Sequence, residues 1–201
     1  MFLSREPVNI FVYYFLEFRG KNKMGNRTVI TGLSRTPMGG MQGGLSEVSA
    51  PDLGAAAIAS SLSRSGLSVN DIDEAIMGCV LPAGLGQAPA RQAAVKAGLP
   101  VNVPATTINK MCGSGMKAIM LAHDSIAAGS NSAVVAGGME SMSNAPHILP
   151  KSRVGMRLGH GNVMDHMFLD GLEDAYEKGR LMGSFAEECA KKYGFSRTEQ
   201  D

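Results

Sequence analysis

The sequence has no tryptophan, few aromatic residues and no excess of charge of either sign. Lys and Arg together number 19 against 18 for Asp and Glu, and aromatic residues make up 5 % of the 201 residues. A balanced charge argues against a protein that binds nucleic acid through bulk electrostatics, so we expect no nucleic-acid partner. The longest apolar run, residues 8–18, contains Asn9 and Glu17 and is too short to span a bilayer, so we expect no membrane partner.

Cysteine is also scarce. The three cysteines, Cys79, Cys112 and Cys189, cannot all pair within one chain, and no signal peptide with a small-residue cleavage site is visible. Free thiols in a reducing, cytoplasmic compartment are therefore expected. No two cysteines have the spacing of metal ligands, and the common metal-binding and P-loop patterns are missing, so we expect no metal and no cofactor.

The residues that are abundant are small and apolar. Gly accounts for 25 residues, and 44 % of the chain is hydrophobic, which is enough to bury a core. Short apolar stretches alternate with helical patterns, and this order predicts an α/β fold with a mixed, mainly parallel sheet covered by helices on both faces. The predicted strands are residues 27–33, 74–80, 105–109 and 132–136, and the predicted helices are residues 51–65, 90–97 and 114–128.

The third predicted helix has a recognisable apolar face. Spacing of three and four residues places His123 on the same face as its hydrophobic residues, so we interpret it as a packing histidine. That face comprises Met116, Ile119, Met120, His123, Ile126 and Ala127.

The two ends of the chain differ from this middle part. Residues 1–23 are aromatic-rich and then basic, which fits either a membrane or targeting segment or a non-native extension that precedes a true start at Met24. We expect the second, with residues 1–23 disordered or non-native and residues 24–139 forming the α/β domain. After residue 139 the alternation ends; a helix is predicted over residues 170–194, and a capping box at Ser196 and Glu199 begins another helix. Because that helix starts so close to the last residue, we expect the sequence to be truncated.

Cys112 lies at a position that favours a reactive thiolate. Cys112 follows a predicted strand and directly precedes a predicted helix, where free backbone N–H groups and the helix dipole favour an anion. Thiols in such positions ionise more readily than free thiols. Gly113 and Gly115 remove side chains beside the sulfur, so that a bulky thioester could approach, and the same amides could bind the oxyanion of a tetrahedral intermediate. The alternative is a buried structural cysteine, which is common for free thiols.

Residues 113–118 also fit the dinucleotide-binding pattern G-x-G-x-x-A. In the dinucleotide-binding fold this pattern follows the first strand, whereas here it follows the third. An acidic residue at the usual spacing is also missing, since Glu140 is too far along the chain.

The other thiols are weaker candidates for a nucleophile than Cys112: Cys79 ends an apolar strand, and Cys189 follows two carboxylates that disfavour a thiolate. The remaining histidines, His147, His160 and His166, lie in the irregular region without an evident partner.

Three long motifs resemble the thiolase family, most closely the biosynthetic acetyl-CoA acetyltransferases. The motif INKMCGSGMKAI at residues 108–119 resembles the acyl-enzyme signature of that family. The other two are VLPAGLGQAPARQ at residues 80–92 and GGMESMSNAPH at residues 137–147. The resemblance runs from about residue 27 to residue 201, and residues 1–23 have no counterpart in it.

The resemblance implies that Cys112 is the nucleophile. One acetyl-CoA would acetylate its thiol, and a second, deprotonated at its α-carbon, would attack the resulting thioester to give acetoacetyl-CoA and CoA, or the reverse. The substrates are then CoA thioesters, and the full-length protein is expected to be a homodimer or homotetramer in which the strand near residues 105–109 pairs across a two-fold axis. Residues 140–201 would begin an α-rich loop domain whose Leu172 and Met182 match positions that line the pocket for the CoA arm, although Leu181 stands where many members have histidine.

The same resemblance implies a missing half. Members of the family carry Asn-Glu-Ala-Phe, Gly-His-Pro and Cys-x-Gly-Gly motifs that supply acid/base groups, and none of these is in this sequence. Since losing one such group commonly costs about 10²–10⁴-fold in rate, we expect no sustained turnover from this chain alone. The alternatives are a non-catalytic dimerising module, a thiolase for longer 3-ketoacyl chains and a ketoacyl synthase, the last disfavoured because Cys-Gly-Ser-Gly is thiolase-like.

Overall fold

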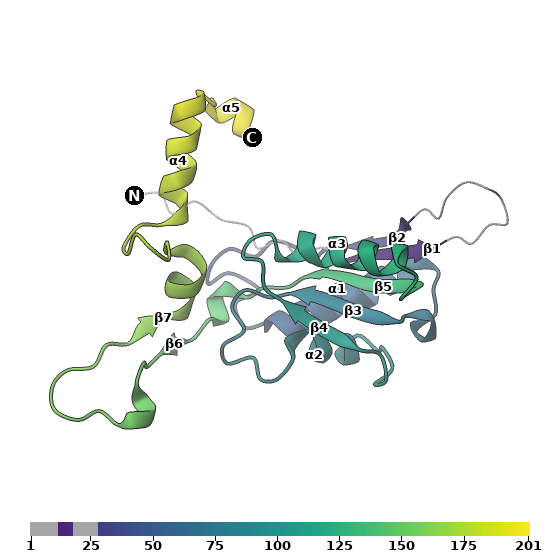
Figure 1. The fold of residues 1–201 in the computed structure, drawn as a ribbon, viewed down its shortest axis with the longest axis horizontal. Coiled ribbons are helices and arrows are strands. Elements are labelled where there is room, and N and C mark those ends of the chain that lie inside the picture. The colour runs from purple at the N-terminus through teal and green to yellow at the C-terminus, as the bar shows by residue number, and fades with distance from the viewer. Residues whose placement is uncertain (1–11, 18–27) are drawn as a thin grey trace. The chain divides into compact units, whose positions relative to one another are not determined.

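The computed structural model describes residues 12–17 and 28–201, which form part of two compact units, Met1–Ala145 and Pro146–Asp201. The first unit contains a five-stranded sheet and the helices that pack on it (Figure 1). The second contains a two-stranded ribbon and short helices. Within the described residues, no helix is both long enough and apolar enough to cross a membrane.

The sheet has the strand order β2-β1-β5-β3-β4. Strand β3 pairs in parallel with β4 and with β5, whereas β1 is antiparallel to both β5 and β2. Four strands therefore run in one direction and β1 runs against them, which confirms the predicted mixed, mainly parallel sheet. The strands are β1 (Val12–Glu17), β2 (Thr28–Ser34), β3 (Glu74–Gly78), β4 (Ala105–Ile108) and β5 (Ala133–Gly138).

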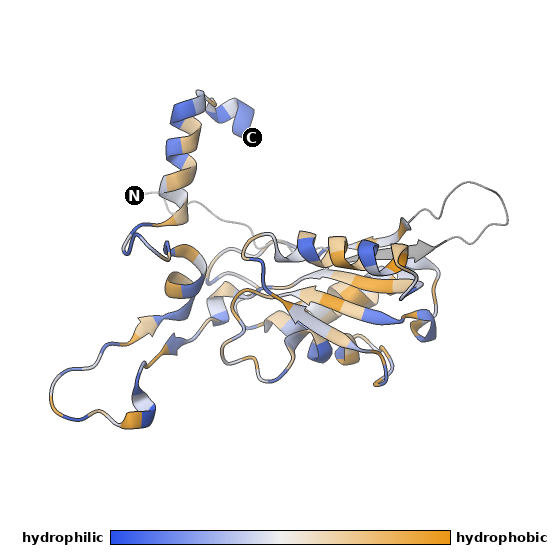
Figure 2. Ribbon diagram, viewed as in Figure 1, coloured by the Kyte–Doolittle hydropathy of each residue, from blue (hydrophilic) through white to orange (hydrophobic). Residues whose placement is uncertain are grey.

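The central strands alternate their side chains between two apolar layers. Met77 and Val135 join the cluster beneath two helices, whereas Ile76 and Val134 join a second cluster beneath a third helix. Strands that are buried on both faces are mostly apolar. Figure 2 shows β5 and the larger part of β3 in the hydrophobic colours. The prediction that helices cover both faces is thereby confirmed.

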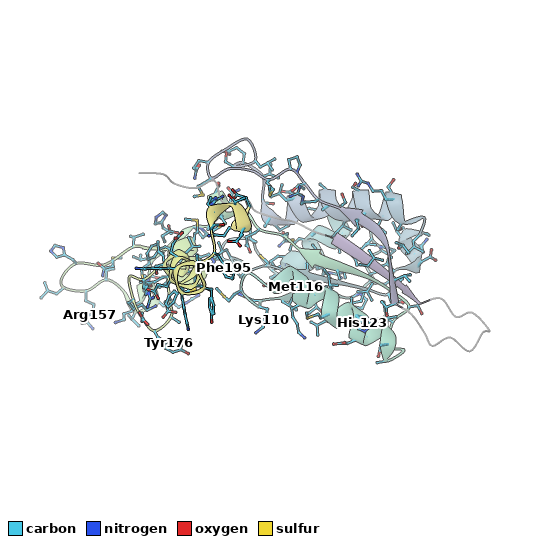
Figure 3. All side chains as sticks on the ribbon, turned by 90° about the horizontal axis from the view of Figure 1, so that it is seen from above. Lys110, Met116, His123, Arg157, Tyr176 and Phe195 are labelled. Atoms are coloured by element: carbon cyan, nitrogen blue, oxygen red, sulfur yellow. The ribbon has the colours of Figure 1, made fainter. Side chains whose placement is uncertain are left out.

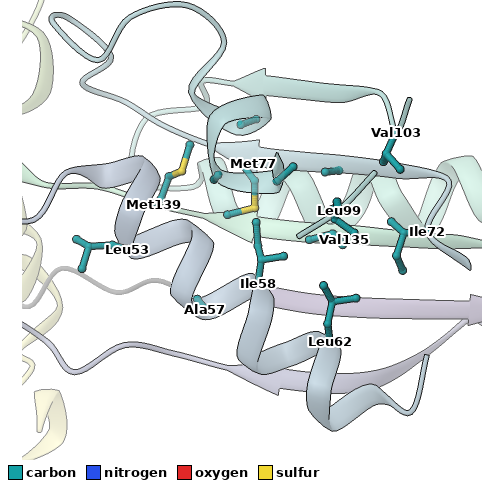
Figure 4. Packing of buried hydrophobic residues seen from close by; sticks show 14 of the residues in the cluster. Leu53, Ala57, Ile58, Leu62, Ile72, Met77, Leu99, Val103, Val135 and Met139 are labelled. Atoms are coloured by element: carbon teal, nitrogen blue, oxygen red, sulfur yellow. The ribbon is translucent and has the colours of Figure 1, made fainter. Parts of the chain in front are cut away.

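Helices α1 (Ala50–Ser65) and α2 (Pro89–Lys96) cover one face of the sheet, and α3 (Ser114–Ala127) covers the other. The first helix begins at Ser49, whose hydroxyl accepts the Asp52 N–H, and ends at Gly66 with φ 76°. That left-handed conformation suits glycine, as the sequence predicted. Ile58 of α1 is fully buried against β3 and β5 (Figure 4), which contributes about 2 kcal/mol of transfer free energy.

The predicted apolar face of α3 is right only for Ile119 and Ile126, which pack in the cluster on the sheet. Met116 and Met120 are 65 % and 50 % exposed, and His123 is exposed as well, so it is not a packing histidine (Figure 3). The helix turns its small residues Ala118 and Ala122 to the sheet instead. Alanines allow the helix axis to come close to the strands, and this close approach outweighs the larger hydrophobicity of the methionines.

Strand β1 is a second departure from the sequence-based expectation. Residues 1–23 were expected to be disordered or non-native, and within them Val12–Glu17 is an ordered strand that lies between β2 and β5 and pairs with both. The run Val-Tyr-Tyr-Phe-Leu has the β-branched and aromatic composition that favours strands. The rest of that segment lies outside the described residues, and its non-native origin stays a prediction.

The second unit is less regular than predicted. It contains an antiparallel pair, β6 (His147–Ile148) and β7 (Met164–Asp165), a π-helical turn Phe168–Leu172, and helices α4 (Met182–Tyr193) and α5 (Arg197–Gln200). The helix expected over 170–194 begins only at Met182. The Glu173 and Asp174 carboxylates accept the backbone N–H groups of Tyr176, Glu177 and Gly179 and hold this stretch in a loop. Its predicted end at Gly194 and the capping box of Ser196 with Glu199 are confirmed.

The two units divide six residues later than the predicted boundary after residue 139. Residues 140–145 stay with the first unit because their side chains bind the loop before α1. The Ser141 hydroxyl donates to the carbonyl of Val48, and the Asn144 amide donates to the carbonyls of Ser46 and Val48.

Candidate active site

Cys112 lies in the turn between β4 and α3, at the carboxyl end of the parallel strands. Its side chain is an exposed free thiol, and the N-cap of α3 is the next residue, Gly113. Within the described part of the chain, the backbone N–H of Cys112 donates no hydrogen bond. The turn therefore presents a reachable sulfur beside a free N–H group at the first turn of a helix, where negative charge is favoured.

Three glycines bring α3 against the sheet at this point. A Cβ on Gly78 would lie 2.5 Å from the Cβ of Ser114, and one on Gly138 would lie 3.2 Å from the Cα of Gly115. Side chains at the ends of β3 and β5 would push the first turn of the helix away. The glycines thus fix where the turn that carries Cys112 stands relative to the strands.

The residue before the cysteine has a left-handed backbone. Met111 has φ 50°, which costs a residue with a side chain about 1–2 kcal/mol. Its N–H donates to Asn109 Oδ1 at 2.9 Å, and its carbonyl accepts the Ser114 hydroxyl at 2.6 Å and the Ser114 N–H at 2.9 Å. These three hydrogen bonds hold the strained residue and with it the direction of the chain at Cys112.

A carboxylate ties the neighbouring strand ends together. Glu140, half-buried just after β5, accepts the N–H groups of Val80 at 2.8 Å and Leu81 at 3.0 Å, which follow β3. The carbonyl of Val80 in turn accepts the side-chain amide of Asn109, which follows β4, at 3.4 Å. The ends of three adjacent strands are thus linked around the Cys112 turn.

The other two thiols are placed differently. Cys79 is 1 % exposed, which confirms its interpretation as a core residue. Burial, followed by the negative charge of Glu140, raises the pKa of the Cys79 thiol to about 12, so it stays protonated at neutral pH. Cys189 is an exposed residue of α4 in the second unit. Of the three cysteines, Cys112 alone lies at a strand-to-helix turn.

Three of the four histidines lie in the second unit, whereas His123 is an exposed residue of α3 in the first. His147 and His160 are exposed residues of the second unit. His166 of that unit is buried, and its Nδ1 lies 2.6 Å from an Asp170 oxygen, so the prediction that it lacks a partner is wrong. The two residues are four apart and face each other across a turn that the sequence pattern did not show.

Leu172 and Met182 both lie in the second unit. Leu172 ends the π-helical turn and is half-buried, and Met182 begins α4 and is 40 % exposed. A bridge between Glu173 and Leu181 brings the two together, because each adjoins one member of that antiparallel pair. Their role in lining a substrate pocket stays a prediction.

The structure gives the nucleotide-binding pattern another explanation. Gly115 packs on the backbone of Gly137 and Gly138, and the carboxylate of Glu140 is engaged by two backbone N–H groups. Neither is arranged as a cradle for a dinucleotide. Among residues 12–17 and 28–201, no three His, Cys, Asp or Glu side chains come close enough together to hold a metal ion.

Asn109 and Glu140 were not identified as site residues from the sequence. Asn109 stands in the signature motif, and its only local signal is the tendency of asparagine to accept the N–H two residues further on, here that of Met111. Glu140 is the first charged residue after a fully apolar strand, which is the signal that could have found it, since a carboxylate there needs donors from the neighbouring strand end.

Comparison with known proteins decides the family. The family model for the thiolase N-terminal domain matches residues 28–201. The chain belongs to the thiolase family. This confirms the resemblance that the three sequence motifs indicated.

Curated thiolase relatives are similar over most of this chain. The acetyl-CoA acetyltransferase of Cupriavidus necator is 53 % identical over 173 residues, which is 86 % of this chain and 44 % of the relative. Acetyl-CoA acetyltransferase 2 of Arabidopsis thaliana is 52 % identical over 172 residues, covering 86 % of this chain and 42 % of the relative. A probable acetyl-CoA acyltransferase of Staphylococcus aureus is 49 % identical over 175 residues, 87 % of this chain and 44 % of the relative. The chain therefore spans less than half of the length of these thiolases.

Proposed function

We propose that Cys112 is the nucleophile of an acetyl-CoA C-acetyltransferase, which condenses two acetyl-CoA molecules to acetoacetyl-CoA and CoA or runs the reverse thiolysis. The observation that carries the proposal is the exposed Cys112 thiol at the start of α3, beside its own N–H, which donates no hydrogen bond within residues 12–17 and 28–201. The acetyltransferase names of the relatives support the substrate class.

The first half-reaction is a transfer between two thioesters. The Cys112 thiol gives its proton to water and its sulfur attacks the carbonyl carbon of acetyl-CoA. A sulfur–carbon bond forms to Cys112, and the bond to the CoA sulfur breaks. CoA leaves as a thiolate and takes up a proton from water. A covalent intermediate divides one difficult carbon–carbon step into two easier transfers.

The surroundings of Cys112 suit that transfer. Its backbone N–H is free to donate to the oxyanion of the tetrahedral intermediate, a contact that typically lowers the barrier by about 3–4 kcal/mol. Gly113 follows directly without a side chain, which leaves room for the pantetheine arm beside the sulfur.

The second half-reaction needs a base for the α-carbon of the second acetyl-CoA. Cys79 cannot serve, because it is sealed in the core with a pKa of about 12. The resemblance to the family implies that the acid/base histidine and second cysteine belong to a part of the protein beyond these 201 residues. We therefore expect this chain alone to stop at the acetylated cysteine.

The finer assignments rest on the family. Leu172 and Met182 would line the acyl and pantetheine pocket, which their adjacency across the Glu173–Leu181 bridge supports. Strand β4, at the edge of the sheet, offers its free side to a second copy, which supports a homodimer or homotetramer. The free thiols of all three cysteines support a reducing, cytoplasmic compartment.

A thiolase for longer acyl chains is a second candidate, since one relative is named an acyltransferase rather than an acetyltransferase. Acyl-chain preference separates the two. Incubation with acetyl-CoA or with a long-chain acyl-CoA, followed by counting of label on the denatured protein, should show preferential incorporation of acetyl in this chain.

The same assay tests the proposal against a non-catalytic dimerising module. Label that hydroxylamine removes is held as a thioester, and we expect such label in the unsubstituted chain and in a Cys189→Ala variant. It should be lost in Cys112→Ala. A stable label that survives in Cys112→Ala, or no label in any variant, contradicts the proposed acyl transfer.

A further inference from the structure

The backbone that carries Cys112 is held by a continuous chain of hydrogen bonds. Met111, directly before the cysteine, has φ 50°, a conformation that an L-residue adopts only when its surroundings impose it. Asn109 Oδ1 accepts its N–H at 2.9 Å. The same side chain donates from Nδ2 to the carbonyl of Val80 at 3.4 Å. Asn109 thus links the turn to the neighbouring strand end.

The strand end that Asn109 reaches is itself fixed. Glu140 accepts the N–H groups of Val80 and Leu81 at 2.8 and 3.0 Å. The order of contacts is therefore Glu140 carboxylate, Val80 peptide unit, Asn109 amide and Met111 N–H, with Cys112 as the next residue. The hydrogen bonds of Glu140 and Asn109 in this series reach the backbone of Val80, Leu81 and Met111, so both residues act on Cys112 through other groups.

We propose that Glu140 and Asn109 are positioning residues for Cys112: they set the direction of its thiol and N–H through the Val80 peptide unit and the Met111 backbone. The inference rests on the proposed function only in taking Cys112 to be the reacting group. A displacement of a reacting group by one ångström can cost about two orders of magnitude in rate, so a loosened turn should change the reactivity of Cys112 before it changes the stability of the fold.

The opposite end of the same strands supplies matched controls. Asp73, before β3, accepts the N–H groups of Ser132 and Ala133 at 2.6 and 3.0 Å. Like Glu140, it thus binds two successive backbone N–H groups next to a neighbouring strand. Asn131 donates its side-chain amide to Glu74 at 2.8 Å. Variants at Asp73 and Asn131 remove equivalent hydrogen bonds far along the strands from the Cys112 turn.

The test measures how fast iodoacetamide alkylates Cys112 relative to Cys189 in the same molecule, by peptide mass spectrometry at one pH. Cys189 is exposed in the other unit and serves as an internal reference. In Glu140→Gln and Asn109→Ala we expect the ratio of the two rates to fall about tenfold, as the geometry of the turn is lost. In Asp73→Asn and Asn131→Ala it should stay within twofold of wild type.

A conservative variant separates positioning from general damage. Asn109→Ser keeps an oxygen that can accept the Met111 N–H, although more weakly, so it should recover part of the rate ratio that Asn109→Ala loses. Urea denaturation of every variant checks the fold. If Glu140→Gln unfolds, the comparison of Asn109→Ala with Asn109→Ser tests the positioning proposal by itself. Asn109 is an exposed turn residue, so these two variants should fold.

An unchanged ratio in Asn109→Ala, or an equal fall in the Asp73 and Asn131 controls, overturns the positioning proposal. Because the labelling needs no acetyl-CoA, its outcome is independent of the acylation assay. If the chain takes up no acetyl group but the alkylation ratio falls as expected, the positioning proposal is supported and the proposed function is contradicted. If the chain is acetylated but the ratio does not fall, the proposed function is supported and the positioning proposal is contradicted.

Discussion

Gly78 and Ser114 touch so closely that a Cβ on the glycine would lie 2.5 Å from the Cβ of the serine. The last residue of β3 thereby sets how near the first turn of α3 comes to the sheet. The position of the Cys112 turn follows from this contact, since Gly113 is the only residue between Cys112 and Ser114.

Alanine substitutions at the glycines of this contact should form a graded series. An added Cβ meets its nearest atom at 2.5 Å on Gly78, 3.2 Å on Gly138 and 3.4 Å on Gly115. We expect Gly78→Ala to destabilise the first unit most, by about 1–3 kcal/mol as overpacking generally does, and Gly115→Ala least. Urea denaturation measures the free energies of unfolding. Gly44→Ala, where an added Cβ meets no atom within 4 Å, is the control, and a loss there as large as that of Gly78→Ala would refute the explanation.

The Cys79 thiol should make the protein less stable in alkaline solution. Its pKa is raised to about 12 in the folded chain, so the folded state keeps a proton that the unfolded chain loses near pH 9. This stabilising contribution is complete below pH 9 and decreases between about pH 9 and 12, by up to about 1.4 kcal/mol per pH unit. Cys79→Ser does not titrate there and should lose stability less steeply than wild type. Equal slopes of unfolding free energy against pH for the two proteins would show that the thiol does not contribute.

Substitutions on the two sides of α3 should differ in how much they lower the stability of the fold. Ala122 is fully buried, so Ala122→Leu should cost about 1–3 kcal/mol through overpacking. Met120 is half exposed, and Met120→Gln should change stability by less than about 0.5 kcal/mol. Thermal unfolding of both variants checks the prediction. A larger loss of stability in Met120→Gln than in Ala122→Leu would show that the methionine side of α3 is the buried one, as the sequence pattern suggested.

Removal of the Cys112 thiol should leave the fold intact. The side chain is exposed and makes no hydrogen bond in the described part of the chain, so Cys112→Ala should change the free energy of unfolding by less than about 0.5 kcal/mol. Urea denaturation beside wild type measures this change. A loss of several kcal/mol would instead indicate a structural cysteine.

Local signals in the sequence predicted most of the first unit. Strand and helix positions followed from short apolar runs and from end signals such as Gly66, which has φ 76° after α1. The site at Cys112 was predictable because its signals are local: a strand, a cysteine and glycines at the start of a helix. The family resemblance added the chemistry.

What the sequence pattern missed depends on contacts between distant residues. Hydrophobic periodicity favoured Met116 and Met120 for the buried side of α3, but the close approach to the sheet selects Ala118 and Ala122. Glu140 lies 60 residues from Val80 in sequence, so no local pattern could reveal their hydrogen bond. The pairing of β1 between β2 and β5 is likewise a long-range choice.

Peptide mapping after incubation with acetyl-CoA tests the central claim most directly. The chain holds three free thiols, and digestion separates the peptides that carry them. We predict an acetyl group in thioester linkage on Cys112, with Cys79 and Cys189 unmodified. An acetyl group on either of those residues while Cys112 remains a free thiol would contradict the assignment of the nucleophile.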